Sequence, residues 1–114
     1  MEEVVGEEKP AADSRHGYTV TVEKGSLESE PHSDNVKYSV SLSGAVDERW
    51  CRAFHIVQLD STGFFLYRLE PIYRIVTFQL PSDAHPTRVT RLVERLERLV
   101  GDVNHSASLW GGSA

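Results

Sequence analysis

The stretch VKYSVSLSGAVDERWCRAFHIV, residues 36–57, contains two different hydrophobic periods and decides the fold. Before Gly44, every second side chain is apolar (Val36, Tyr38, Val40 and Leu42), which is typical of a β-strand with one buried face. After Gly44, the apolar side chains follow helical spacing (Val46, Trp50, Ala53, Phe54 and Val57), and Asp47 is a candidate N-cap. A strand followed directly by an amphipathic helix predicts a domain that contains both kinds of element.

The residues on the C-terminal side of this stretch predict a hairpin and a second helix. Residues 64–69 and 72–80 are strand-like around the break at Glu70 and Pro71. The last helix has Pro86 in its first turn and a continuous apolar stripe (Val89, Leu92, Val93, Leu96, Leu99, Val100 and Val103). Its N-cap candidates are Ser82, Asp83 and His85. We expect residues 106–114, which have no period, to form a flexible tail.

The residues on the N-terminal side predict one further strand behind a disordered leader. Residues 17–23 alternate apolar and polar side chains, whereas residues 24–35, with Gly25 and Pro31, are typical of a loop. Residues 1–16 contain Glu, Ala and Pro with little apolar material, so they are predicted to be an acidic disordered segment. A single domain is therefore expected over residues 17–105.

These elements follow one another in the order β-β-α-β-β-α. Their last five match a split-βαβ arrangement that lacks its usual final strand, and the strand at residues 17–23 is a candidate for that edge position. Each helix has one apolar stripe, so both helices are expected on the same face of the sheet. The predicted fold class is therefore α+β, a two-layer, ferredoxin-like sandwich of about four mainly antiparallel strands and two helices.

Charge and composition exclude several classes of protein. The chain has 114 residues, a net charge of −5 and a single cysteine, Cys51, which cannot form an intramolecular disulfide. No apolar stretch approaches the roughly 20 residues that span a bilayer. Residues 1–35 contain three basic and nine acidic side chains, and the remainder nine basic and eight acidic. We therefore expect a cytoplasmic protein without a membrane partner, and we attribute its acidity to the leader.

The sheet face away from the helices is the first candidate functional surface. Alternation along the predicted hairpin places Tyr73, Ile75 and Thr77 on this face, together with Tyr67 from the preceding strand. A face with exposed aromatic and apolar side chains is typical of an association surface. We predict a small binding module with a protein partner, namely a homodimer formed through this open face. Another protein, a small ligand, or the chain's own leader or tail are the alternatives.

An arginine ridge on the last helix is the second candidate surface. Arg88, Arg91, Arg95 and Arg98 fall within an arc of about 80° beside the apolar stripe. Guanidinium groups in such a row bind phosphates or carboxylates, but Glu94 and Glu97 are near enough on the helix to pair with them instead. The acidic leader is another candidate to pair with the ridge. Because residues 36–114 are nearly neutral, nucleic acid is not the favoured partner.

No catalytic, cofactor-binding or metal-binding residue is predicted. Asp47, Cys51 and His55 lie at successive i+4 positions, but about 12 Å of helix separates the first from the last, too far for one metal ion. The alternative function is a small-molecule binder or enzyme of the dimeric ferredoxin-like kind. It requires a pocket between helix and sheet around Trp50, His55, Tyr67 and Tyr73.

Overall fold

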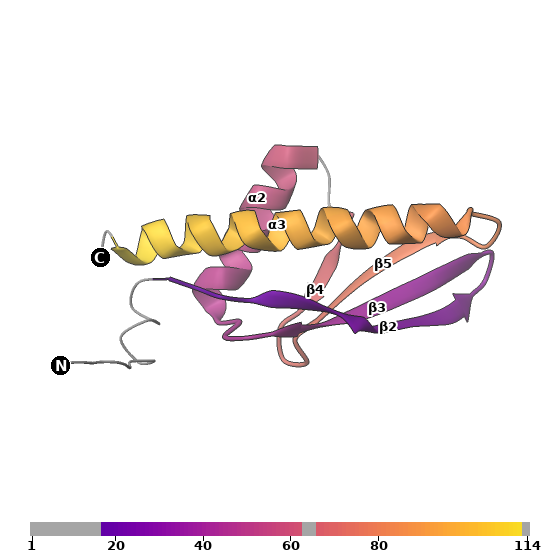
Figure 1. Ribbon diagram of the computed structural model, residues 1–114, viewed down its shortest axis with the longest axis horizontal. Coiled ribbons are helices and arrows are strands. Elements are labelled where there is room, and N and C mark those ends of the chain that lie inside the picture. The colour runs from indigo at the N-terminus through magenta and orange to yellow at the C-terminus, as the bar shows by residue number, and fades with distance from the viewer. Residues whose placement is uncertain (1–16, 63–65, 113–114) are drawn as a thin grey trace.

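The computed structural model describes the backbone of residues 17–62 and 66–112 (Figure 1). These residues form β2 (Thr21–His32), β3 (Asn35–Ser43), α2 (Glu48–Thr62), β4 (Arg68–Glu70), β5 (Ile75–Pro81) and α3 (Pro86–Gly112). The predicted leader, residues 1–16, and the start of the predicted strand at residues 64–69 lie outside the described residues.

The four described strands form one antiparallel sheet in the order β2-β3-β5-β4. Strands β3 and β4 run parallel to each other on either side of β5 and are connected through α2, which is a split βαβ unit. Both helices lie on one side of the sheet, with α3 along its length and α2 crossing α3 (Figure 1). The predicted ferredoxin-like α+β sandwich is confirmed, with β2 at the edge position.

Strand β2 is longer than the sequence predicts. Residues 24–35 are expected to be a loop, but pairing with β3 continues until His32 lies opposite Asn35. The register shifts between Glu23 and Glu28, and the Ser26 hydroxyl bridges this bulge by accepting from the Ser41 N–H at 2.7 Å. The loop prediction is wrong because its Gly and Pro lie in a bulge and on an edge strand, where a sheet tolerates them.

The N-termini of both helices carry side-chain caps. In α2, Asp47 Oδ1 accepts the Trp50 N–H at 3.0 Å. In α3, which begins at Pro86, His85 Nδ1 accepts the Thr87 N–H at 3.2 Å. Asp47 and His85 are both among the N-cap candidates that the sequence predicts, so these two predictions are confirmed.

Helix α3 continues through most of the segment predicted to be a flexible tail. It passes Gly101 without a break and ends at Gly112. The reason is packing, because Ala107 extends the apolar stripe by one turn beyond Val103, and both side chains are fully buried. The second half of α3 is therefore part of the domain rather than an appendage.

Asn104 joins three segments that are far apart in the sequence. Its Oδ1 accepts from the Trp50 indole N–H at 2.8 Å and from the Val20 N–H at 3.2 Å. Its Nδ2 donates to the Val20 carbonyl oxygen at 2.8 Å. Through one side chain, α3 is connected to α2 and to the segment that leads into β2.

The turn after β3 requires glycine. Gly44 has a φ of 110°, and a Cβ at this position would lie 3.1 Å from the Cα of Val20. A side chain is excluded by both the backbone conformation and the close approach of the segment before β2. This glycine therefore lets the chain turn from β3 into α2 directly beside Val20.

Among the described residues, no helix is both long enough and apolar enough to cross a membrane.

Candidate functional site

The sheet face away from the helices is polar. Strand register places Ser39, Thr77 and Arg68 in one row across β3, β5 and β4, and Ser41, Ile75 and Glu70 in the next. Lys37 and Gln79 form a third row. Hydroxyl, amide and charged groups therefore dominate a face on which the sequence predicts aromatic and hydroxyl side chains.

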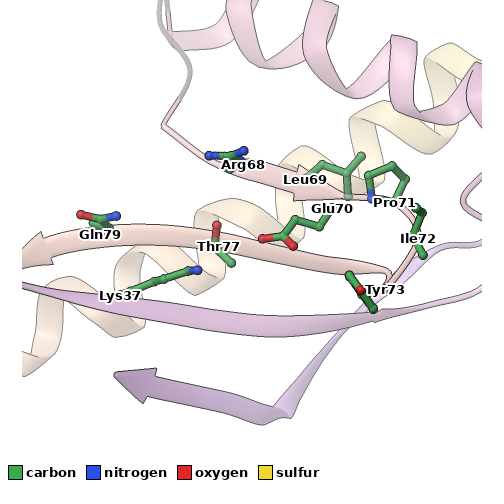
Figure 2. Close-up of a pocket in the computed structure, with 9 residues that line it drawn as sticks. All are labelled: Lys37, Arg68, Leu69, Glu70, Pro71, Ile72, Tyr73, Thr77 and Gln79. Atoms are coloured by element: carbon green, nitrogen blue, oxygen red, sulfur yellow. The ribbon is translucent and has the colours of Figure 1, made fainter. Parts of the chain in front are cut away.

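A recess of about 510 Å³ opens on this face between β4 and β5 (Figure 2). It is lined by Lys37, Arg68, Leu69, Glu70, Pro71, Ile72, Tyr73, Thr77 and Gln79. Thr77 lies on its floor and is 6% exposed, and its hydroxyl forms no hydrogen bond with another side chain or backbone group in the described ranges. Buried hydroxyl groups normally have partners, so the recess is suited to a polar group that would supply one.

The charged groups of the recess do not neutralise one another. In Figure 2 the Lys37 ammonium and the Glu70 carboxylate both extend toward the space above Thr77, with Arg68 on the opposite wall. Within residues 17–62 and 66–112, no ion pair joins these three side chains. Two cations against one carboxylate make the recess a site of net positive charge.

The tip of the β4–β5 hairpin adds an apolar rim to the recess. Ile72 is 89% exposed and Tyr73 is 69% exposed. The turn is closed by the Tyr73 N–H, which donates to the Glu70 carbonyl oxygen at 3.2 Å, and Arg74 has a φ of 53°. Because the turn holds both side chains outward, they are available to a partner that covers the recess.

Three of the four residues of the predicted interaction surface lie on the open side of the sheet, and the fourth does not. Thr77 and Ile75 face the open side of the sheet, and Tyr73 lies on the rim of the recess. Tyr67 has to be corrected, because its side chain is only 2% exposed and lies on the helix side, where its hydroxyl donates to the Leu92 carbonyl oxygen at 2.6 Å. It lies two residues before the buried Leu69, so alternation along the chain places it on the helix side, with Arg68 and Glu70 on the open face.

Three acidic residues of β2 belong to the open face and were missed. Glu23, Glu28 and Glu30 are in register with Ser41, Ser39 and Lys37. Glu23 lies in the strand predicted at residues 17–23, whereas Glu28 and Glu30 lie in the segment predicted to be a loop. Their i, i+2 spacing at Glu28 and Glu30, followed by the alternation of β3, is the signal that would have placed them on one strand face.

The buried phenol of Tyr67 makes the stability of the fold depend on pH. Burial raises the pKa of Tyr67 to about 12, against a smaller lowering by the nearby Arg95 and Arg98 guanidinium groups. Above about pH 10 the unfolded chain loses this proton before the folded one does, so stability falls as the pH rises.

We therefore expect the free energy of unfolding to fall by about 2 kcal/mol between pH 9 and pH 12 through Tyr67. Urea titrations at each pH measure it, and Tyr67→Phe provides the control. The variant should lose about 1 kcal/mol at pH 7 with the hydrogen bond to Leu92, and should show a smaller decline above pH 9. Equal declines in the two proteins would show that Tyr67 is not responsible.

The arginine ridge is exposed on α3 as the sequence predicts. Arg88, Arg91, Arg95 and Arg98 all line a hollow of about 330 Å³ together with Leu92 and Glu94. Arg95 and Arg98 also line a second hollow of about 280 Å³ with Ser61, Tyr67, Leu99 and Asp102. The ridge and the recess therefore lie in different layers of the sandwich.

The pocket required by the small-molecule alternative is not assembled by its four residues. Trp50 is fully buried in the core, and Tyr67 lines the hollow beside α3. Tyr73 lines the recess on the opposite side of the sheet, and His55 is exposed on α2. The prediction of one common pocket is wrong because Trp50 and Tyr67 are core residues.

Within the Asp47, Cys51 and His55 series, Asp47 and Cys51 have structural roles. Asp47 caps α2 and also accepts a hydrogen bond from the Tyr18 hydroxyl, 2.8 Å from Oδ2. Burial raises the pKa of the half-buried Cys51 thiol, and the carboxylates of Asp47 and Glu48 raise it further. A thiol held in its neutral form is a poor nucleophile. In the part of the chain that the structure describes, no three potential ligands are grouped to hold a metal ion.

Comparisons of the chain with known protein families, with curated proteins and with solved structures found no significant match.

Proposed function

We propose that the protein is a small non-catalytic binding module that self-associates through the open face of its sheet. The observation that supports this proposal is the separation of charge across that face. Glu23, Glu28 and Glu30 lie along the β2 edge, whereas Arg68 lies on β4 at the other edge, and with Lys37 of β3 it gives the recess a net positive charge against the single carboxylate of Glu70. A surface with an acidic side and a basic side is complementary to a rotated copy of itself.

The symmetry of such a dimer follows from the strand order. A two-fold axis parallel to the strands, placed between two stacked faces, brings β2 of one protomer over β4 of its partner. Glu28 and Glu30 then approach the recess of the partner, and the contact occurs twice. A carboxylate in the recess would accept from Lys37 and Arg68 and would also supply a partner for the Thr77 hydroxyl.

The size of the face favours a weak dimer. The strands have 12, 9, 7 and 3 residues. At about 3.4 Å per residue and about 4.8 Å between strands they present roughly 500 Å² per protomer, less than the roughly 800 Å² typical of stable complexes. Ile72 and Tyr73 add apolar contact at the rim. We therefore expect a dissociation constant on the order of 10–100 μM that rises with salt concentration, since exposed ion pairs are screened.

Charge reversal tests this proposal. The variant Lys37→Glu/Arg68→Glu should be monomeric in light scattering at concentrations where the natural chain is dimeric, because the whole face becomes acidic. The variant Glu28→Lys/Glu30→Lys should also be monomeric. An equimolar mixture of the two should recover the mass of a dimer, since each then meets the opposite charge.

A matched control distinguishes loss of the dimer caused by charge reversal on the open face from a general effect of the change in net charge. Arg49→Glu/Arg52→Glu makes the same change in charge on exposed positions of α2, which lies on the other side of the sheet, and should leave the mass unchanged. A natural chain that is monomeric up to millimolar concentration, or a mixture that fails to recover the dimer, contradicts the proposal. A cytoplasmic location completes it, supported by the free thiol of Cys51.

A further inference from the structure

The arginine ridge retains charge that the described part of the chain does not neutralise. Its four guanidinium groups span ten residues of α3, about 15 Å along the helix axis. Glu97, a predicted partner, lies instead 3.6 Å from the Lys24 ammonium group of β2. Among residues 17–62 and 66–112, no carboxylate forms an ion pair with any of the four arginines.

The surface around the ridge is positively charged and contains two hollows. The hollow of about 330 Å³ beside Leu92 and the hollow of about 280 Å³ beside Tyr67 are neighbours that share Arg95 and Arg98, and together they are called the arginine groove below. Glu94 and Asp102 are the acidic side chains that line it. Four cations against two carboxylates favour an extended anionic ligand with several negative groups.

We propose that the arginine groove binds residues 2–8 of the same chain, Glu-Glu-Val-Val-Gly-Glu-Glu. The two acidic pairs of this segment are five residues apart, which corresponds to about 17 Å in an extended chain. That separation matches the 15 Å or so between Arg88 and Arg98. The two valines between the acidic pairs then lie opposite Leu92, the apolar residue in the centre of the ridge.

The described chain begins close enough to the groove for this contact. Tyr18 donates its backbone N–H to Ser108 Oγ at 2.9 Å, so residue 17 lies beside the second half of α3. Ser108 is about 15 Å along the helix from Arg98, on the other flank, so the segment must also cross the helix surface. Eight residues lie between Glu8 and Gly17, and the nine Cα–Cα steps span up to about 30 Å, which is sufficient for this path.

The connection within one chain makes a weak contact significant. A short tether raises the local concentration of the segment to about the millimolar range, so a few exposed ion pairs can hold it against α3. The contact should be sensitive to salt, because exposed charges are screened over about 8 Å at physiological ionic strength. This inference does not depend on self-association through the sheet.

A spin label at position 5 tests the proposal on the full chain. The label is attached to Val5→Cys in a Cys51→Ser background, and paramagnetic broadening of backbone amides is measured by NMR. At low salt, the amides of residues 88–98 should broaden at least about three times more than those of β2, β3 and β5. This preference should disappear at 0.5 M salt, where the screening length falls below about 5 Å.

Two variants and one mixture make the test specific. Arg91→Gln/Arg95→Gln should abolish the preference for residues 88–98, whereas Arg49→Gln/Arg52→Gln, with the same loss of charge on α2, should retain it. Broadening spread evenly over the domain, or unchanged in the ridge variant, overturns the proposal. A mixture of spin-labelled chain with unlabelled, nitrogen-15-enriched chain should show no broadening of residues 88–98. Broadening there would mean that the segment belongs to a second copy, which also overturns it.

Discussion

Replacing Asn104 with leucine is expected to destabilise the fold by about 4 kcal/mol. The change removes the acceptor of the Val20 N–H (Asn104 Oδ1, 3.2 Å) and the donor to the Val20 carbonyl oxygen (Asn104 Nδ2, 2.8 Å). It also removes the acceptor of the Trp50 indole N–H, which is the same Oδ1 at 2.8 Å. Val20 and Trp50 are 1% and 0% exposed, so water cannot replace these hydrogen bonds. Each buried polar group left without a partner costs about 1–3 kcal/mol, a large share of the 5–15 kcal/mol typical of a domain.

Urea unfolding measures this loss, and two further variants define its origin. His105→Leu changes an exposed neighbour on α3 and should alter stability by less than about 0.5 kcal/mol. Asn104→Asp keeps the acceptor but, when ionised, places a negative oxygen against the Val20 carbonyl oxygen. Its stability should rise as the pH falls and the protonated carboxyl regains a donor. A loss below 1 kcal/mol for Asn104→Leu would contradict the assigned role.

Replacing Gln58 with leucine is expected to cost about 3 kcal/mol. Gln58 is fully buried, and its amide accepts the Tyr67 N–H at 2.6 Å and donates to the Tyr67 carbonyl oxygen at 3.1 Å. The backbone before β4 is thus paired with a helix side chain rather than with a neighbouring strand. Leucine has a similar volume, so the loss would come from the two unpaired backbone groups rather than from a cavity.

The near-isosteric change Gln58→Glu separates hydrogen bonding from volume. A buried carboxylate is unfavourable, so its pKa should lie above the usual range and the variant should be more stable at pH 4 than at pH 7. Gln58→Leu should show no such additional dependence on pH. Urea titrations of the three proteins at both pH values check this, and a Gln58→Glu stability that does not change with pH would contradict the burial assigned to the amide.

The change of hydrophobic period was sufficient to predict the element order and the layers. Alternation along residues 36–42 and helical spacing after Gly44 correspond to β3 and α2, and the stripe from Val89 onward corresponds to α3. Each of these segments has one apolar face, and that face is buried in the core. Local pattern and tertiary packing agree here, so the sequence alone is informative.

The candidate site was harder to predict, because its geometry depends on contacts between segments. The extent of β2 depends on Ser26, whose hydroxyl bonds Ser41 across the bulge. The direction of Tyr67 depends on Gln58 and Leu92. None of these contacts has a periodic signal, so the polar recess is visible only after the chain is folded, although the i, i+2 spacing of Glu28 and Glu30 indicates the acidic strand.

The arrangement around Asn104 also determines when the domain can become complete during translation. Strands β2 and β3 can pair as a hairpin once they leave the ribosome, but their apolar face waits for the helix that carries Asn104. Roughly 60 residues separate the end of β3 from this asparagine, which corresponds to about 3–12 s of synthesis at 5–20 residues per second. For that interval the nascent chain exposes its future core, so the ribosome-bound hairpin is the form most in need of a chaperone.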